Sequence, residues 1–234
     1  MNTIAKIYKS KFKESLNPYG FKLYRKTFYR VVNDVAQTIM LNNWRNCYTV
    51  NFYIWSLFLG LDSLYCEGYE LHELRKSDIP NWHLYDKYWE VFPSHSQSHI
   101  EEMVDEMLSL ILEYVIPAFE RVTDWKSGEN EISYFGELFR KVTHSVEHVH
   151  NIEYARLNRT NYFMHIKVGE YEKAIEIAKE MIPLNPGWEK LFTPELELLL
   201  KGDYQYFHDL FEKNEREARE FLDNPSKHKR HYGS

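Results

Sequence analysis

Apolar residues in the first sixteen positions recur every three or four residues, which is the spacing of one helix face, and lysines fill the positions between them. The pattern predicts a helix over residues 2–16. Pro18 and Gly20 follow directly. They should end the helix, because proline cannot continue the hydrogen-bond ladder and glycine accepts a left-handed turn.

After Gly20 the spacing changes to alternation, and β-branched and aromatic residues become frequent. Three runs predict strands: Thr27–Val32, residues 35–42 and residues 48–59. The pair Asn33-Asp34 separates the first two runs and is typical of a two-residue hairpin turn. The sequence therefore predicts an antiparallel sheet.

The predicted turn sets a strand register, with Arg30 opposite Gln37, and the polar loop 42–46 suggests that Leu41 lies opposite Tyr48. Strict alternation then sorts the side chains onto two faces. The apolar face collects Phe28, Val32, Val35, Ile39, Leu41, Val50, Phe52 and Ile54. The mixed face collects Tyr29, Thr38, Met40, Asn51, Tyr53 and Trp55.

A second helix is predicted over residues 99–122, where apolar residues form one continuous stripe that includes Met103. Ser98, with acidic residues three and four positions later, fits its start. Pro117 should bend the helix near its end. Before it, clustered aromatic residues predict a short helix over residues 82–92.

Beyond residues 126–130, a polar segment that contains glycine, the whole chain has helical character. Helices are predicted over residues 131–142, 143–157, 160–182, 194–201 and 204–222. The predicted fold class is therefore α+β. An N-terminal antiparallel sheet with helices (1–126) precedes an all-α helical-hairpin domain (131–222) and a flexible basic tail (223–234).

A three-residue motif repeats along the helical half of the chain. Gly169-Glu170-Tyr171 and Gly202-Asp203-Tyr204 lie 33 residues apart, and Gly136 begins a related triplet 33 residues earlier. This period suggests tetratricopeptide-like hairpins, in which glycine permits the turn and the tyrosine packs back on the first helix. Plain antiparallel helices are the alternative.

The charge balance excludes several classes of partner. The chain has 29 Lys and Arg against 35 Asp and Glu, a formal net charge of −6. A surface built to neutralise phosphates has the opposite sign, so nucleic acid and anionic membrane are not expected partners. There is no apolar stretch of membrane-span length and no secretory signal, so we expect a cytoplasmic protein. Cys47 and Cys66 are expected to be free thiols.

Four segments of the first half resemble a bacterial domain-of-unknown-function family. They are Gly20-Phe21-Lys22, Thr27-Phe28-Tyr29-Arg30, Tyr48-Thr49-Val50-Asn51 and Tyr114-Val115-Ile116-Pro117. The resemblance covers about residues 5–125 and implies an α+β fold. This sequence differs from the family pattern after Asn51: the family usually has a glycine shortly after this position, whereas this chain continues with bulky residues. The resemblance supplies no catalytic residues.

The segment His144-Ser-Val-Glu147-His148 is the sharpest chemical motif in the chain. On a helix the two histidines share a face, as zinc ligands do, and the string resembles the inverted zinc-peptidase motif. A third ligand would be needed, for which Glu195 and Glu197 are candidates. Because histidine and glutamate are abundant here, the motif also arises by chance, so we predict neither a metal nor any other cofactor.

Arg30 and Gln37 form the first candidate binding pair, because the predicted register puts them side by side on the apolar face. A charge there needs a partner. Arg30 either holds a carboxylate or phosphate of a small anionic ligand, or reaches an acidic residue on a packed helix.

Asn51, Tyr53 and Trp55, with Tyr29, form the second candidate binding set. An exposed Tyr/Trp/Asn face suits recognition of a partner. The alternative is that one of the two predicted helices covers this face.

The sequence contains no phosphate loop, nucleophile elbow or dinucleotide fingerprint. We therefore favour a non-catalytic protein-interaction module, such as an immunity or accessory protein that occludes a protein partner. The alternatives are a metal-dependent hydrolase using His144, Glu147 and His148, and a small anionic-ligand binder using Arg30.

Overall fold

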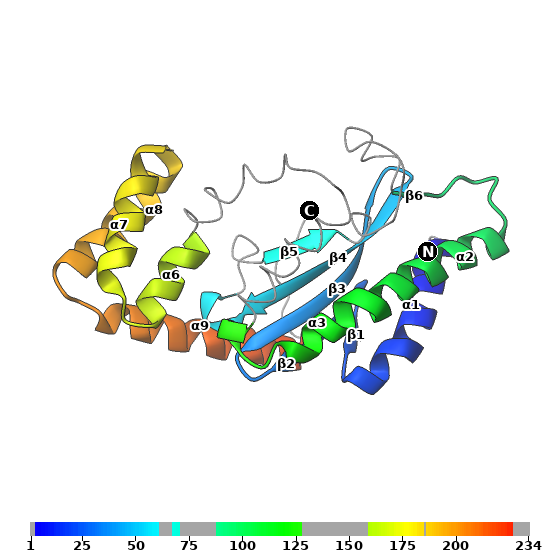
Figure 1. Ribbon diagram of the computed structural model, residues 1–234, viewed down its shortest axis with the longest axis horizontal. Helices are drawn as coiled ribbons and strands as arrows, with labels where there is room; N and C mark the ends of the chain where they lie inside the picture. The colour runs from blue at the N-terminus through cyan, green and yellow to red at the C-terminus, as the bar shows by residue number, and fades with distance from the viewer. Residues whose placement is uncertain (1–2, 61–66, 71–87, 128–158, 185, 227–234) are drawn as a thin grey trace. The chain divides into compact units, whose positions relative to one another are not determined.

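The computed structural model describes residues 3–60, 67–70, 88–127, 159–184 and 186–226. These residues form an antiparallel sheet with helices and a C-terminal helical region, which confirms the predicted α+β class (Figure 1). The chain divides into two compact units. The first comprises Met1–Ser56 and Cys66–Val146, and the second Leu57–Tyr65 and Glu147–Ser234.

Helix α1 (Thr3–Leu16) begins the first unit, as its apolar spacing predicts, and buries one face. A 3-10 turn, Asn17–Tyr19, follows it. Gly20 then takes the left-handed conformation, with φ of +80°. Its amide donates to the carbonyl of Asn17 at 3.0 Å, which reverses the chain toward the sheet.

The sheet has the strand order β1-β2-β3-β4-β5, and every pairing is antiparallel. A short strand, β6, pairs with β4 along the edge that β5 also uses. The strands are β1 (Lys22–Tyr24), β2 (Thr27–Val32), β3 (Val35–Trp44), β4 (Cys47–Ser56), β5 (Glu67–Glu70) and β6 (Trp89–Glu90).

The register between β2 and β3 is confirmed, since Arg30 lies opposite Gln37. The predicted register between β3 and β4 is wrong by two residues: Leu41 pairs with Val50, not with Tyr48. The reason is that both strands run on to a two-residue turn at Arg45-Asn46, so residues 42–44 belong to the strand. Two residues are one full side-chain period, so the predicted sorting of the two faces still holds.

The helices of the first unit pack on the apolar face of the sheet (Figure 1). The Tyr8 hydroxyl of α1 donates to the carbonyl of Ile39 at 3.3 Å. The rings of Phe12 and Phe28 pack at 6.1 Å, and those of Phe52 and Phe119 at 6.5 Å. The predicted helices therefore lie on the face opposite Asn51, Tyr53 and Trp55.

The predicted helix over residues 99–122 consists of α2 (Gln97–Leu110), a π-helical turn (Ile111–Val115) and α3 (Ile116–Arg121). Its N-cap is Ser96, not Ser98, because the Ser96 hydroxyl accepts from the amide of His99 at 3.2 Å. The π turn lies directly ahead of Pro117, which has no amide hydrogen to donate to Glu113. The break in the helix therefore has an identifiable cause.

The second unit is helical. Its described elements are η2 (Leu57–Leu59), α6 (Arg159–Lys167), α7 (Tyr171–Met181), η8 (Ile182–Leu184), α8 (Pro186–Leu200) and α9 (Gln205–Asp223). The helical segment predicted over residues 160–182 consists of α6 and α7, and the chain turns between them at Gly169, where the repeated Gly-acid-Tyr triplet predicts a turn. Helix α8 begins at Pro186 rather than at 194, because proline suits the first turn of a helix. Pro194 is accommodated inside it.

The two Gly-acid-Tyr turns of the second unit have the same hydrogen bonds. Gly169 donates to Ile166 at 3.0 Å, and Gly202 donates to Leu199 at 3.0 Å. The residue after each glycine also donates to the carbonyl five positions before it. Each turn is thus the same C-terminal helix cap, with the glycine in the left-handed conformation.

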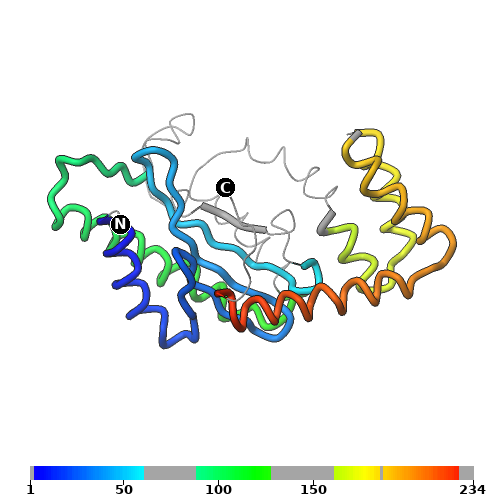
Figure 2. Tube along the Cα trace, turned by 180° about the vertical axis from the view of Figure 1, so that it is seen from behind, coloured from blue at the N-terminus to red at the C-terminus, as the bar shows by residue number. Residues whose placement is uncertain are grey.

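Tyr171 and Tyr204, the tyrosines of these turns, stack on each other. Helix α7 packs against α6 and α8, and α9 packs against η2 and α6 (Figure 2). The ring of Phe58 meets that of Phe211 edge to face at 5.1 Å, and Asn214 donates to the carbonyl of Phe58 at 3.0 Å. The η2 segment is therefore anchored on α9.

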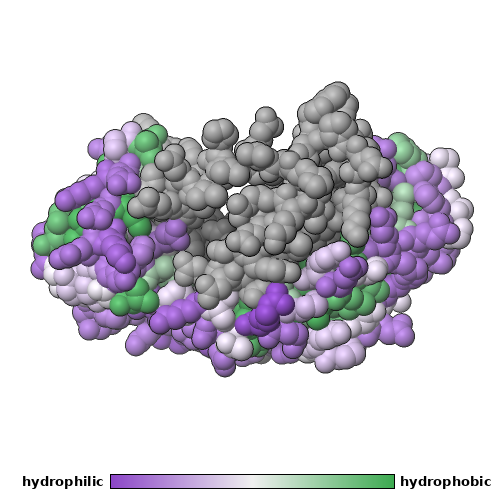
Figure 3. Space-filling view, in the orientation of Figure 1, coloured by the Kyte–Doolittle hydropathy of each residue, from purple (hydrophilic) through white to green (hydrophobic). Residues whose placement is uncertain are grey.

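The visible surface of α7 and α8 is mainly hydrophilic, with separated apolar patches (Figure 3). Exposed apolar residues of this unit include Val168, Leu184, Leu191 and Leu200. Among the helices within the described ranges, none combines the length and the apolar character that a bilayer crossing requires.

Candidate functional site

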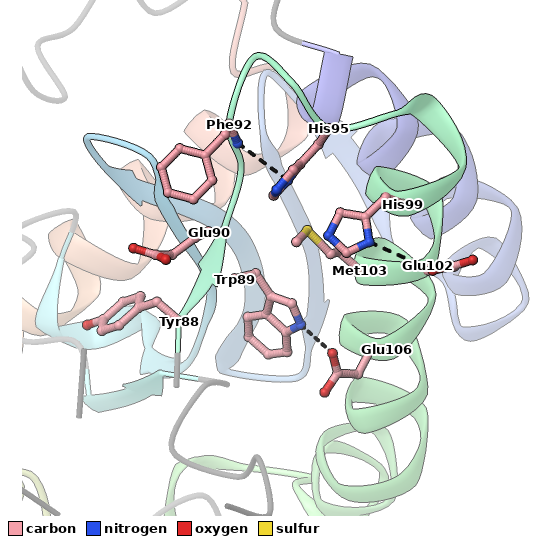
Figure 4. Close-up of a pocket in the computed structure, with 9 residues that line it drawn as sticks. All are labelled: Tyr88, Trp89, Glu90, Phe92, His95, His99, Glu102, Met103 and Glu106. Carbon is pink, nitrogen blue, oxygen red and sulfur yellow. Dashed lines mark hydrogen bonds and ion pairs between the residues drawn. The ribbon is translucent and has the colours of Figure 1, made fainter. Parts of the chain in front are cut away.

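A pocket of about 500 Å³ lies in the first unit, between β6 with the loop that follows it and the N-terminal half of α2 (Figure 4). It combines aromatic, acidic and imidazole side chains. They are Tyr88, Trp89, Glu90, Phe92, His95, His99, Glu102, Met103 and Glu106.

Trp89 joins the two sides of the pocket. It pairs with Tyr48 of β4 in the sheet, and its side chain is only 1% exposed. Its indole N–H donates to Glu106 Oε2 on α2 at 2.7 Å (Figure 4). A hydrogen bond to a carboxylate is stronger than one between neutral groups, so this contact fixes Glu106 as well as the tryptophan.

The α2 side of the pocket follows from helix spacing. His99, Glu102, Met103 and Glu106 recur every three or four residues and so share one helix face. The rings of His95 and His99 meet edge to face with centroids 4.5 Å apart. His99 Nδ1 lies 3.8 Å from Glu102 Oε2, and His95 Nδ1 accepts from the amide of Phe92 at 3.4 Å.

The lining holds three carboxylates and neither lysine nor arginine. Lys11 of α1 approaches the same helix but pairs with Asp105, at 2.6 Å, which is not part of the lining. Glu90 accepts from the Cys47 thiol at 3.8 Å. Burial, and next the charge of Glu90, raise the pKa of that thiol, so Cys47 is a neutral thiol rather than an activated nucleophile.

Large apolar side chains are accessible at and beside the pocket. Phe92 is 39% exposed, and Met103, which the sequence places in the buried stripe, is also exposed. Trp44, at the β3–β4 turn, is 57% exposed, and the Arg45 guanidinium lies 4.8 Å from its ring centroid. The amide of Val91 donates to the carbonyl of Asn46 at 2.9 Å, which ties this turn to the pocket wall.

The predicted pair Arg30 and Gln37 lies away from this pocket and in direct contact, since Arg30 Nε donates to Gln37 Oε1 at 2.6 Å. The guanidinium also reaches Glu120 of α3 at 2.6 Å and the carbonyl of Tyr19 at 2.8 Å. The second of the two alternatives for Arg30, an acidic partner on a packed helix, is therefore the one observed. The pair joins β2, β3 and α3.

The predicted residues Asn51, Tyr53 and Trp55 lie together on the other face of β4. Asn51 and Trp55 are 7% and 8% exposed, and Tyr53 is half-buried. They therefore do not form the exposed surface considered above. Asn51 Nδ2 donates to the Tyr53 hydroxyl at 2.8 Å. Among the described residues, nothing donates to Asn51 Oδ1 or accepts from Trp55 Nε1.

The motif His144, Glu147 and His148 lies outside the described residues, as do the predicted helices over 131–157 and the tail. Glu195 and Glu197 lie on α8. Within the described part of the chain, no group of three or more His, Cys, Asp or Glu side chains is placed to hold a metal ion.

Sequence reasoning missed the pocket residues and Trp44. The aromatic run 82–92 suggested a helix, yet Trp89 and Glu90 form β6. Glu102 and Glu106 lie on the polar side of the predicted helix 99–122, which helix spacing alone assigns to solvent. One usable signal was present: His99, Met103 and Glu106 repeat at helix spacing, so Met103 of the apolar stripe lies beside imidazole and acidic side chains.

Comparison with known proteins gives no relationship: no family model, no curated protein and no solved structure matches this chain. The resemblance of residues 5–125 to a domain-of-unknown-function family therefore stays a prediction.

Proposed function

We propose that this chain is a non-catalytic protein-interaction module whose pocket between β6 and α2 receives side chains of a protein partner. The observation that supports the proposal is the composition of the pocket: Phe92 and Met103 are accessible at a concavity whose base is the buried Trp89. Aromatic residues and methionine are enriched in the cores of protein interfaces, and an aromatic ring there buries a large area with few rotatable bonds.

The neighbouring turn supports the same proposal. Trp44 is more than half exposed, and its turn is hydrogen-bonded to Val91, which directly follows β6 in the pocket wall. A partner that entered the pocket could therefore also cover Trp44. Occlusion of a partner by surface complementarity, as in an immunity or accessory protein, requires only such a surface.

Affinity purification from a native lysate tests the proposal. The wild-type chain should retain a protein in stoichiometric amount, and the double variant Phe92→Ser/Met103→Ser should retain about tenfold less of it. Leu112→Ser, which removes an equally accessible apolar side chain outside the lining, is the control and should behave as wild type. Equal recovery with the pocket variant, or no saturable partner, would refute the proposal.

A further inference from the structure

We infer that the pocket binds an arginine side chain in a basic segment of the partner protein. This inference rests on the proposed function and specifies the chemistry of the partner. Three properties of the lining carry it: the sign of its charge, the pairing state of its carboxylates, and the accessible apolar surface between them.

The lining has one sign of charge. Glu90 comes from β6, and Glu102 and Glu106 come from α2 (Figure 4). A concavity that holds three carboxylates and neither lysine nor arginine raises the local concentration of cations. The positive end of the α2 dipole opposes this only weakly, because the dipole acts within the first turn and Glu102 and Glu106 lie beyond it.

Two of the carboxylates are available to a ligand. Glu106 is bound to the Trp89 indole. Glu90 is exposed and has a weak contact with the Cys47 thiol, and Glu102 is exposed with His99 Nδ1 at 3.8 Å. No lysine or arginine of the described segments pairs with either of them. A guanidinium entering here would meet carboxylates that no lysine or arginine of the described residues neutralises.

Apolar surface separates these carboxylates. Phe92 and Met103 are exposed, and Tyr88 is half-buried. The three methylene groups of an arginine side chain pack on such surface while the head group stays at the rim. The planar guanidinium can also lie over the Phe92 ring and pair with a carboxylate through two parallel hydrogen bonds, which an ammonium cannot do.

Peptide selection tests the inference directly. Random peptides displayed on phage are selected against the whole chain and measured by fluorescence polarisation. Arginine should be enriched among the peptides that bind, and replacing that arginine by the neutral isostere citrulline should weaken binding about tenfold. Glu90→Gln/Glu102→Gln should weaken binding by a similar factor. Glu212→Gln/Glu217→Gln, with the same change in net charge on α9, should not.

The outcomes separate this inference from the proposed function. Peptides that lose affinity for Phe92→Ser/Met103→Ser but bind Glu90→Gln/Glu102→Gln as tightly as wild type would overturn the arginine assignment and leave the proposed function standing. Selected peptides without basic residues would overturn it as well. Removal of residues 227–234 should leave peptide affinity unchanged. A tenfold gain in peptide affinity on this truncation would instead mean that the chain's own basic tail occupies the pocket, and it would overturn the assignment of an arginine from a partner.

Discussion

Tyr171 and Tyr204 stack ring on ring, with centroids 3.6 Å apart and planes within 3° of parallel. The two tyrosines belong to equivalent turns 33 residues apart, so the stack joins two copies of the repeated Gly-acid-Tyr motif. A centroid separation this short means that the rings overlap almost fully. That arrangement is less favourable electrostatically than an offset or edge-to-face pair.

We therefore expect the stack to contribute mainly through buried area. Tyr204→Ala should lower the free energy of unfolding by about 1–2 kcal/mol, because a half-buried aromatic ring is lost. A double-mutant cycle with Tyr171→Ala should give a coupling of only about 0.5 kcal/mol, at the low end for aromatic pairs. Urea unfolding measures both, with Tyr206→Ala as the exposed control. A coupling near zero would mean that the rings do not interact in solution.

Gln37 should matter more for stability than the ion pair beside it. Gln37 is fully buried and donates to the carbonyl of Phe119 at 2.8 Å while accepting from Arg30. Gln37→Leu leaves both partners unsatisfied and should cost about 3 kcal/mol. Glu120→Gln changes an ion pair whose acid is 53% exposed and should cost less than about 1 kcal/mol. Urea unfolding measures both losses of unfolding free energy. Equal losses for Gln37→Leu and Glu120→Gln would contradict this ranking.

Two buried tryptophans offer a matched comparison. The Trp89 indole N–H binds a carboxylate at 2.7 Å, whereas that of Trp55 has no acceptor among the described residues. Replacement by phenylalanine removes the N–H and the same volume in both cases. Trp89→Phe should therefore be more destabilising than Trp55→Phe by about 2 kcal/mol. Thermal unfolding of the two variants gives the difference. The opposite order would show that the Trp55 N–H has an acceptor in solution.

Asp124 should make stability depend on pH in the acid range. The amide of Ser127 donates to Asp124 Oδ1 at 2.8 Å and its hydroxyl does so at 3.0 Å, and these bonds lower the pKa of Asp124 below its ordinary value of 3.8. A lowered folded pKa stabilises the fold above pH 3.8, and this contribution is lost as the pH falls through the folded pKa. NMR titration should give a midpoint below 3.8, and Ser127→Ala should return it toward 3.8. Because the variant keeps the amide bond, the return should be partial; an unchanged midpoint in Ser127→Ala would exclude the hydroxyl bond as a cause.

The fold class and the sheet faces could be predicted because they depend on local periodicity. The turn at Asn33-Asp34 is short and typical, so the register of Arg30 and Gln37 followed from it. The register of β4 did not follow, because Arg45-Asn46 lacks glycine and resembles part of a longer loop. Arg45 nevertheless adopts a positive φ of 56°, as a two-residue hairpin turn requires.

The candidate site could not be predicted because it depends on contacts between distant segments. Strand β6 is two residues long, and its pairing of Glu90 with Cys47 joins positions far apart in the chain. Only this pairing brings Trp89 to Glu106 and turns a polar helix face into a pocket wall. The burial of Asn51 and Trp55 is likewise set by packing, which alternation alone cannot distinguish from exposure.

Because Leu57–Leu59 belongs to the second unit, the chain cannot be cut at residues 126–130 into two self-sufficient fragments. The three side chains are at most 3% exposed, and their anchor on α9 is synthesised about 150 residues later. A nascent chain leaving the ribosome therefore carries this apolar triplet uncovered until α9 emerges. An expressed fragment of residues 1–127 should aggregate unless these three residues are made polar.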